Sequence, residues 1–586
     1  MPTNEDIAKV LGEIGEYLAM QDVPFKPRAY EKVAETIRSL SESVSEMYKK
    51  GGLSAVKNIP GVGASIAESI EEFIKKGKIA YHEELKRGAP VNLAELRRVE
   101  GLGPRKIKIL YQKLGIRTLS DLKKAATSHK IRSLEGFGEK TEENILKGIE
   151  FVNASGDRKI LGFILPDIRV IEDNLKKIKG VSKVVVAGST RRRRETIGDI
   201  DFLVVSEKSE PVMDFFVNMP EVARIMAKGP TKSMVHLKSG LDADIRVVPK
   251  ESYGAALNYF TGSKDHNVAL RKLAIEKGYK LNEYGLFKIK GKGGGEEKIA
   301  GDTEEGIYKA LGLPYIEPEL REMMGEIEAA KSGKLPKLID YKDLKGDLQV
   351  QTSWTDGSAS IEEMAIAAYE QGLSYMVVTD HTKRLAMTHG LDDESVLKQG
   401  KEIDKVNQKL KEKKIKFYIL KGTECDILKD GSLDLSDKVL ATLDVVGVSV
   451  HSYFNLPINE QTKRVEKAIR NKNVDIFFHP TGRLINKRSA YEIDMERIIK
   501  VAGETGTVLE IDAYPDRLDM NYEYIRQCVE SGVKMSIDSD AHATTHFQYL
   551  EFGIDQARRG WAEKEDIINA WPMEKMLSML KGETND

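Results

Sequence analysis

Two aspartates one residue apart, Asp199 and Asp201, stand at the start of an apolar run, because Phe-Leu-Val-Val follows at 202–205. A β-branched, apolar run directly after a glycine predicts a strand, and side chains two positions apart on a strand point to the same side. Two carboxylates this close repel each other, so their pKa values rise unless a cation lies between them. Mg²⁺ held with a phosphate-bearing substrate is the usual cation for carboxylate oxygens. The pair therefore predicts a magnesium site for phosphate chemistry.

The segment before this strand is rich in groups that bind phosphate. Gly188 and Ser189 precede an arginine run at 191–194, and backbone N–H groups and guanidinium charges suit a triphosphate. Taken singly, an Asp-x-Asp is usually an exposed strand end, and an arginine run is usually a solvated patch. Together, and running into an apolar strand, they are typical of a nucleotidyltransferase palm. A third carboxylate is expected from a neighbouring strand, where Asp244 and Asp242 both occur.

A second set of polar residues follows short apolar runs in the C-terminal part of the chain. These runs predict strands at 375–379, 417–421, 445–450, 474–478, 508–511 and 534–537. Their alternation with helical segments indicates parallel strands and a (β/α) barrel, in which function gathers at the C-terminal strand ends. A lone histidine there is most often structural, whereas several such strand ends together predict a metal site. The residues concerned are His381, Glu424, His451, His479, Glu510, Asp540 and His542.

The elements that position these residues belong to several domains, since the chain has 586 residues. It is 31% charged and 41% hydrophobic, as in ordinary globular proteins, and has neither a membrane-spanning apolar run nor a signal-peptide core. Cys425 and Cys528, two cysteines in a long chain, favour a reducing, cytoplasmic setting. Residues 1–345 hold 60 Lys and Arg against 51 Asp and Glu, and residues 346–586 hold 31 against 41. This asymmetry suits a nucleic-acid grip joined to a carboxylate-rich metal site.

The front of the chain repeats the pattern apolar-x-Gly-apolar-Gly three times, each time before a segment with helical spacing. The pattern is typical of a helix–hairpin–helix, in which glycines permit a tight turn and N–H groups of the next helix bind a backbone phosphate. Such contacts position DNA without reading its sequence. The alternative is three ordinary helical hairpins. The glycines are Gly61 and Gly63, Gly101 and Gly103, and Gly136 and Gly138.

With these motifs, residues 1 to about 320 resemble the bacterial and archaeal family X DNA polymerases, which have a core like that of DNA polymerase beta. Asp244, followed by Ile-Arg-Val-Val, resembles the third-aspartate strand of the family and is therefore preferred to Asp242. The resemblance implies a multidomain fold: helical helix–hairpin–helix domains, an α/β nucleotidyltransferase palm with a thumb, and a barrel. The expected domains are lyase-like 1–80, fingers-type 81–150, palm 151–250, thumb 251–320, linker 321–345 and barrel 346–586.

The resemblance also assigns residues around the nucleotide and the DNA. Tyr259-Phe260-Thr-Gly262 looks like the turn beneath the incoming sugar, where Tyr-Phe excludes a ribose 2′-OH, and a flexible thumb hairpin is expected at 285–300. Tyr30, which is expected to bind DNA, falls in a helix that looks like that of the lyase domain. Ser69 stands where the lyase enzymes carry their Schiff-base lysine, so abasic-site lyase activity by that route is not expected. The expected nucleotide-binding residues are Gly188, Ser189, Arg192, Tyr259, Phe260, Gly262, Asn267 and Arg271.

Residues 346 to about 575 resemble the polymerase and histidinol phosphatase domain, PHP, which is fused to family X polymerases. The family's three-metal cluster hydrolyses phosphodiesters and commonly gives 3′–5′ exonuclease activity. Its first motif reads His-x-His, but this chain has Gln349-Val-Gln351, and a neutral amide suits zinc or manganese less well than imidazole. The metal shared with Glu424 and Asp540 is therefore expected to be weakened or lost. The resemblance implies that Glu424, His451 and His479 can still hold a second ion, and that Asp356, His381 and His542 can hold a third.

We therefore expect a cytoplasmic, monomeric enzyme that extends primers: a DNA-directed DNA polymerase that fills short gaps in base-excision repair. Asp199, Asp201 and Asp244 would hold two Mg²⁺ ions, with Mn²⁺ as a substitute, and the PHP domain would hold Mn²⁺ or Zn²⁺ in an incomplete cluster. The expected partners are gapped or primer–template DNA and deoxynucleoside triphosphates, without a membrane. Two alternatives stay open: a PHP nuclease or phosphoesterase whose front half grips DNA, and a non-enzymatic DNA-binding scaffold.

Overall fold

The computed structural model describes residues 2, 4–38, 40, 43–99, 101–156, 158–289, 296–385 and 388–582. The chain forms two compact units, one of Asp157–Leu338 and the other of Pro2–Gly156 with Ile339–Asp586. Among the helices described, none is long and apolar enough to cross a membrane. The glycines of the expected thumb hairpin, Gly291, Gly293, Gly294 and Gly295, lie outside the described residues.

Residues 2–156 are helical and share one hydrophobic core, with fully buried side chains such as Leu11, Ile37 and Leu122. Three of the helices start at the second glycine of a repeated motif, since Gly63, Gly103 and Gly138 are the N-cap residues of α4, α7 and α9. The helices are α1 (Asn4–Met20), α2 (Lys26–Arg38), α3 (Val44–Lys57), α4 (Ala64–Lys76), α5 (Ala80–Gly88), α6 (Leu93–Leu96), α7 (Pro104–Leu114), α8 (Leu119–Thr127) and α9 (Glu139–Ser155).

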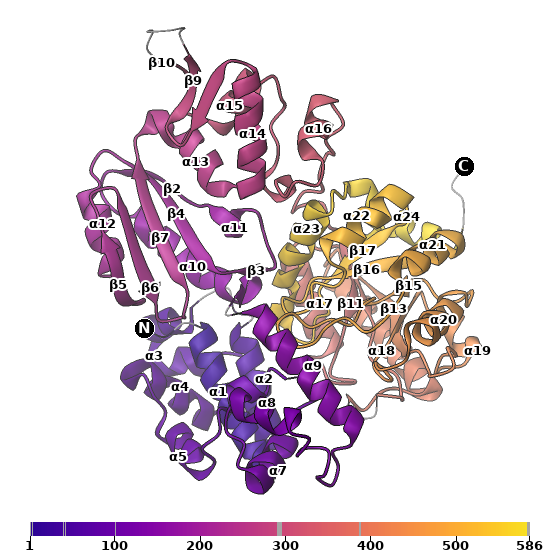
Figure 1. Ribbon diagram of the computed structural model, residues 1–586. Coiled ribbons are helices and arrows are strands. Elements are labelled where there is room, and N and C mark those ends of the chain that lie inside the picture. Colours follow the sequence, from indigo (N-terminus) through magenta and orange to yellow (C-terminus); the bar gives the residue numbers. More distant parts are fainter. Residues whose placement is uncertain are drawn as a thin grey trace. The chain divides into compact units, whose positions relative to one another are not determined.

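A five-stranded sheet forms the palm, in the order β2-β4-β7-β6-β5 (Figure 1). Its central pair, β4 and β7, is parallel, and the other neighbours are antiparallel. Helix α10 (Leu161–Lys176) packs on β2, and α12 (Glu210–Val217) packs on β5 and β6. The strands are β2 (Val181–Val186), β4 (Asp199–Ser206), β5 (Val222–Lys228), β6 (Lys232–Leu237) and β7 (Asp242–Val248).

The thumb joins three helices to a small antiparallel sheet of the order β10-β9-β8. Two ion pairs anchor the start of α15: Glu304 Oε2 lies 2.6 Å from Arg191, and Glu304 Oε1 lies 2.7 Å from the fully buried Arg321. The side chain of Ser263 caps α14 by accepting from the N–H of His266. The elements are α13 (Tyr253–Thr261), α14 (Lys264–Glu276), β8 (Tyr279–Asn282), β9 (Gly285–Ile289), β10 (Glu296–Ala300) and α15 (Glu304–Ala310).

Residues 339–582 form a nearly closed barrel of parallel strands in sequential order, which confirms the predicted (β/α) barrel. A bridge between Val350 and Ala541 brings the first strand to the segment that follows the last. Most of these strands are buried along their whole length, because helices cover the outside and side chains fill the inside. The strands are β11 (Gly346–Val350), β12 (Tyr375–Val378), β13 (Tyr418–Asp426), β14 (Val445–Ser449), β15 (Ile476–Phe477), β16 (Val508–Asp512) and β17 (Met535–Asp538).

Candidate functional site

The palm aspartates lie on the parallel strand pair β4 and β7. The register places Asp201 opposite Asp244 and Asp199 opposite Asp242, so four carboxylates occupy adjacent positions. Burial, followed by the charges of Asp199 and Asp244, raises the pKa of Asp201 to about 7. A carboxylate whose charge is this unfavourable without a cation fits a hard divalent ion, for which oxygen is the preferred ligand. Asp199, Asp201 and Asp244 are thus a suitable donor set for Mg²⁺.

Asp242 and Asp244 differ in their surroundings although both project from the same face of β7. The carboxylate of Asp242 is hydrogen-bonded to Nδ1 of His236 at 2.7 Å. Asp244 forms an ion pair with Lys232, with Nζ and Oδ2 3.1 Å apart, and its charge acts on Asp201. This electrostatic coupling favours Asp244 as the third member of the metal site, in line with the sequence prediction.

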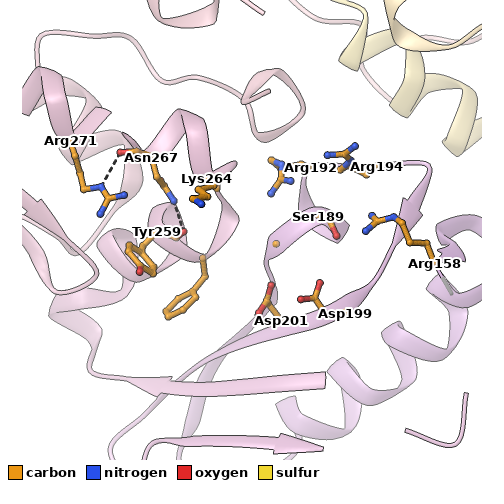
Figure 2. A pocket seen from close by; sticks show the side chains of 13 residues that line it. Arg158, Ser189, Arg192, Arg194, Asp199, Asp201, Tyr259, Lys264, Asn267 and Arg271 are labelled. Carbon is orange, nitrogen blue, oxygen red and sulfur yellow. Dashed lines mark hydrogen bonds between the residues drawn. The ribbon is translucent and has the colours of Figure 1, made fainter. Parts of the chain in front are cut away.

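A pocket of about 400 Å³ opens beside Asp199 and Asp201 (Figure 2). In Figure 2 the two aspartates lie below Ser189, with arginine side chains beyond it, and Tyr259 lies toward the opposite end. The pocket brings together all eight residues predicted to bind the nucleotide, and their individual roles stay predictions. Sequence reasoning missed three cations that also line it: Arg158, Arg194 and Lys264. Arg194 belongs to the arginine run that first indicated a phosphate site.

Gly188 and Ser189 form the part of the pocket that adjoins the aspartates. Gly188 has a positive φ of 60°, and a Cβ there would lie 2.3 Å from Oδ2 of Asp201, so a larger residue would displace the carboxylate. The hydroxyl of Ser189 is buried and has no hydrogen-bond partner among the described residues. A buried hydroxyl without a partner is costly, and an oxygen of a bound phosphate would satisfy it.

The Arg192 guanidinium is fixed against the turn at the end of α13. Its Nη1 donates to the carbonyl of Thr261 at 2.5 Å, and its Nε lies 3.0 Å from Oε1 of Glu322. Gly262, with a φ of 70°, places its Cα so that an added Cβ would come within 3.1 Å of the same guanidinium. The side chain of Arg192 is therefore pre-positioned at the edge of the pocket.

Tyr259 and Phe260 form an edge-to-face pair with ring centroids 5.1 Å apart. The side-chain amide of Asn267 donates to the Tyr259 carbonyl at 2.7 Å, and Nε of Arg271 donates to the carbonyl of Asn267 at 3.2 Å. The Phe260 ring also stacks against Arg246 of β7, with the guanidinium carbon 5.0 Å from the ring centre. The aromatic turn is thus connected to both α14 and the strand that carries Asp244.

The three repeated motifs of residues 2–156 have the same backbone geometry. The first glycine of each, Gly61, Gly101 or Gly136, has a φ of 80°, 76° or 81°, a conformation that favours glycine. The second, Gly63, Gly103 or Gly138, has an ordinary negative φ, and an added Cβ would meet nothing within 4 Å. Neither backbone strain nor packing within the chain therefore requires glycine at the second position. Glycine is a favoured N-cap residue, and the open space beside it would also admit a partner such as a DNA phosphate.

The lyase-like helix pair has serines where an imine-forming lysine is expected. The Ser69 hydroxyl donates to the Ser65 carbonyl at 3.1 Å, and both serines lie near the buried Tyr30. The neighbouring Lys75 is paired with Glu71 at 2.8 Å. Ser65 and Ser69 thus offer hydroxyl groups for hydrogen bonds, but neither supplies an amine that could act as a nucleophile.

Two groups of side chains in the barrel can each hold a metal ion, and His381 belongs to both. Ligand atoms of Asp356, His381 and His542 lie within 4.8 Å of one another, as do those of His381, Glu424 and His451. The first group is the one expected from the resemblance. The second group contains His381 where the resemblance implies His479. The Nε2 atom of His479 nevertheless lies 2.8 Å from Oε1 of Glu424. Imidazole and carboxylate ligands of this kind fit Mn²⁺ or Zn²⁺.

The electrostatics of this site depend on Glu424 and the rings around it. Burial would raise the pKa of Glu424, but the charges of His381 and His451 hold it well below its usual range. Burial disfavours the charged form of His451, yet Glu424 and Asp426 together raise its pKa to about 9. His479 and Asp540 have positive φ values of 30° and 49°, which are strained for non-glycine residues and occur preferentially at functional sites.

Gln349 and Gln351 lie buried on the inner side of this site, where the resemblance places two histidine ligands. The Gln351 amide nitrogen donates to Oε2 of Glu424 at 2.8 Å. With its amide oriented so that the nitrogen faces Glu510, Gln349 donates to that carboxylate at 2.5 Å. Both amide nitrogens therefore face carboxylates, and this part of the site does not fit a transition-metal ion as two imidazoles would.

Comparison with known proteins identifies the same regions. The DNA polymerase beta thumb family matches residues 256–322, a helix-hairpin-helix domain matches 2–79, a SAM-like helix-hairpin-helix tandem matches 93–150, and the PHP domain matches 347–571. The chain is 38% identical to the DNA polymerase/3'-5' exonuclease PolX of Bacillus subtilis (strain 168) over 580 residues, 98% of this chain and 99% of the relative. It therefore belongs to the family X DNA polymerases that carry a C-terminal PHP domain.

Two more distant relatives each match one part of the chain. A probable phosphatase of Thermoanaerobacter sp. (strain X514) is 31% identical over 221 residues, 36% of this chain and 84% of the relative. DNA polymerase lambda of Arabidopsis thaliana is 27% identical over 297 residues, 46% of this chain and 54% of the relative. One of these relatives is thus named as a probable phosphatase and the other as a DNA polymerase.

Proposed function

We propose that the protein adds deoxynucleotides to a primer 3′-OH in a template-directed reaction and fills short gaps during base-excision repair. The observation that carries this proposal is the pocket in which two palm aspartates adjoin eight residues predicted to bind a nucleotide. The coupling of Asp201 to Asp244 supports a three-carboxylate metal site. The helix–hairpin–helix matches support a DNA grip that does not depend on base sequence.

Each part of the pocket has a distinct task in this reaction. Asp199, Asp201 and Asp244 would hold two Mg²⁺ ions, which supply acidification of the primer 3′-OH and stabilisation of the leaving pyrophosphate. The Ser189 hydroxyl and the Arg192 guanidinium bind triphosphate oxygens, and the fixed position of Arg192 reduces the entropy lost on binding. The Tyr259 and Phe260 rings pack under the sugar and leave no space for a 2′-OH.

Primer extension tests this proposal directly. The full-length protein with Mg²⁺ should extend a labelled primer across a short gap, and Asp201→Ala should abolish extension without loss of the folded state by circular dichroism. Extension that survives this substitution, or no extension by the parent protein, would overturn the proposal.

For the PHP domain we propose metal-dependent 3′–5′ exonuclease activity that is weak or requires high Mn²⁺ concentrations. The two possible metal-binding groups support phosphodiester hydrolysis, and the Bacillus subtilis relative is named as an exonuclease. The amides of Gln349 and Gln351 support the reduced activity. A 3′-labelled primer should be digested slowly at high Mn²⁺ and not at all by Asp540→Ala with His542→Ala. Robust digestion at low metal concentration that the double variant loses would contradict the proposed weakness.

A further inference from the structure

An arginine lies among the carboxylates of the PHP site. Arg517, in the segment that follows β16, has its Nε 3.5 Å from Oδ2 of Asp512 and 3.4 Å from Oδ2 of Asp540. Asp512 is fully buried and Asp540 is 3% exposed, so both carboxylates are largely removed from water. Two carboxylates in such surroundings need a positive charge or a proton close by. The guanidinium supplies that charge from within the chain.

Arg517 lies in the part of the site where Gln349 and Gln351 stand in place of two histidines. The N–H of Gln351 donates to the Ala541 carbonyl at 2.8 Å, which places the end of β11 directly beside Asp540. The two glutamine amides donate to Glu424 and Glu510, whereas Arg517 faces Asp512 and Asp540. Amide and guanidinium N–H groups thus face four carboxylates in this region. A guanidinium has five N–H donors and no acceptor. It can therefore neutralise carboxylates and donate hydrogen bonds to them, but it cannot bind a metal ion itself.

We propose that Arg517 supplies a permanent positive charge in place of one divalent cation, so that the PHP site holds two exchangeable ions beside one fixed cation. One ion would occupy the Asp356–His381–His542 group. A neutral imidazole has a single lone pair, so the other ion would be held by Glu424, His451 and His479, whose Nε2 atoms lie 3.1 and 2.8 Å from Oε1 of Glu424. The inference rests on the proposed phosphodiesterase function of this domain and specifies which positive charges the site would contain. With 24% of its side chain exposed, Arg517 is also open to solvent, as contact with a phosphodiester oxygen requires.

Two simpler readings compete with this one. In the first, Arg517 is a structural ion pair that has no relation to metal binding. In the second, the Gln351 side-chain oxygen, which is buried without a hydrogen-bond partner among the described residues, acts as a ligand for a third ion. The first predicts that substitution of Arg517 has no effect on the response to metal. The second predicts three ions in the protein as it is.

Counting bound Mn²⁺ separates these readings. The full-length protein with Asp199→Ala, Asp201→Ala and Asp244→Ala, which removes the palm ions, is stripped with EDTA and dialysed to equilibrium against MnCl₂. The excess of Mn²⁺ over the dialysate is then measured by plasma mass spectrometry. We expect two Mn²⁺ per chain. Adding Gln349→His and Gln351→His while Arg517 is retained should leave the count at two, because the guanidinium still occupies the position. Adding Arg517→Ala to those two changes should raise it to three. Three ions in the starting protein, or two in the last variant, would overturn the proposal.

Thermal unfolding provides a second measurement that needs no new ligand. Arg517→Met should lower Tm in EDTA by roughly 5–15 °C, because two buried carboxylates lose their counter-charge, and Mn²⁺ should restore part of this loss. Arg517→Lys should keep most of the stability. Arg526→Met is the matched control, since Arg526 is 25% exposed but pairs with the exposed Glu530 and stacks on Trp561. A loss in Arg517→Met that Mn²⁺ does not reduce, as expected for the control, would overturn the proposal. Neither measurement uses nuclease activity, so an inactive PHP domain would leave the outcome interpretable.

Discussion

Asp199 and Asp201 of the palm line an open pocket, whereas the carboxylates of the PHP site are buried against histidine, amide and guanidinium groups. Burial, and then the neighbouring carboxylate charges that Lys232 and Arg192 compensate only in part, raise the pKa of Asp201 to about 7. In the barrel, Glu424 is compensated so well by histidines that its pKa lies well below the usual range. Burial nevertheless keeps the pKa values of Glu510 and Asp512 well above their usual range, so the barrel site would also take up metal ions while carrying part of its positive charge in the chain.

Removing one palm carboxylate should have the largest effect. Asp244→Ala should reduce primer extension by on the order of 10³-fold, because the metal ions lose a ligand while the pocket stays intact. Asp242→Ala is the matched control on the same face of the same strand and should change extension little. Steady-state extension with Mg²⁺ measures both. If Asp242→Ala proves the more damaging change, the assignment of the third aspartate is wrong.

Removing His381 should have a large effect confined to the barrel. His381 belongs to both possible metal-binding groups, so His381→Ala should lower the exonuclease activity seen at high Mn²⁺ by about 10²-fold and leave extension unchanged. The exposed His389, close in sequence, provides the control His389→Ala. A parallel loss of extension would show that the two sites are not independent.

Acidity should affect the palm by an intermediate amount. With a pKa of about 7 in the metal-free protein, Asp201 is protonated below pH 7, and a proton must leave before Mg²⁺ binds. Apparent Mg²⁺ affinity should therefore fall by about tenfold per pH unit below 7 and level off above it. Calorimetric titration between pH 6 and 8 measures this, with Asp201→Asn as the control that removes the titrating group. A flat profile in the parent protein would refute the raised pKa.

The hairpin glycines should give the smallest effect. Gly103→Ala should weaken binding to gapped DNA by about three- to tenfold, because a methyl group keeps a phosphate from the helix N-terminus. Gly12→Ala is the control, since Gly12 lies in α1 and an added Cβ there also meets nothing within 4 Å. Fluorescence anisotropy at fixed salt measures both. Equal affinity of Gly103→Ala and the parent protein would argue against phosphate contact at this hairpin.

Local patterns allowed part of this structure to be predicted from the sequence. The strand that starts at Asp199 and the apolar barrel strands were recognisable because one short segment determines each. β11 was not predicted as a strand, because buried polar residues at Asp347 and Gln349 interrupt its apolar pattern. Arg517 could not be predicted either, since its partners on β16 and after β17 come together only when the barrel closes. Arg158 and Lys264 likewise meet the pocket through tertiary structure alone.

The stacking of Arg246 on Phe260 has a consequence for how the palm can change. Arg246 and Asp244 stand two positions apart on one face of β7. The backbone of this one strand therefore sets the distance between Asp244 and the residue that stacks on the aromatic turn. A slip of this strand by one residue would turn both side chains away together. In the proposed reaction, such a slip would displace a metal ligand and a residue that supports the aromatic turn together. Insertions or deletions in β7 should impair both at once, whereas side-chain substitutions can alter either one separately.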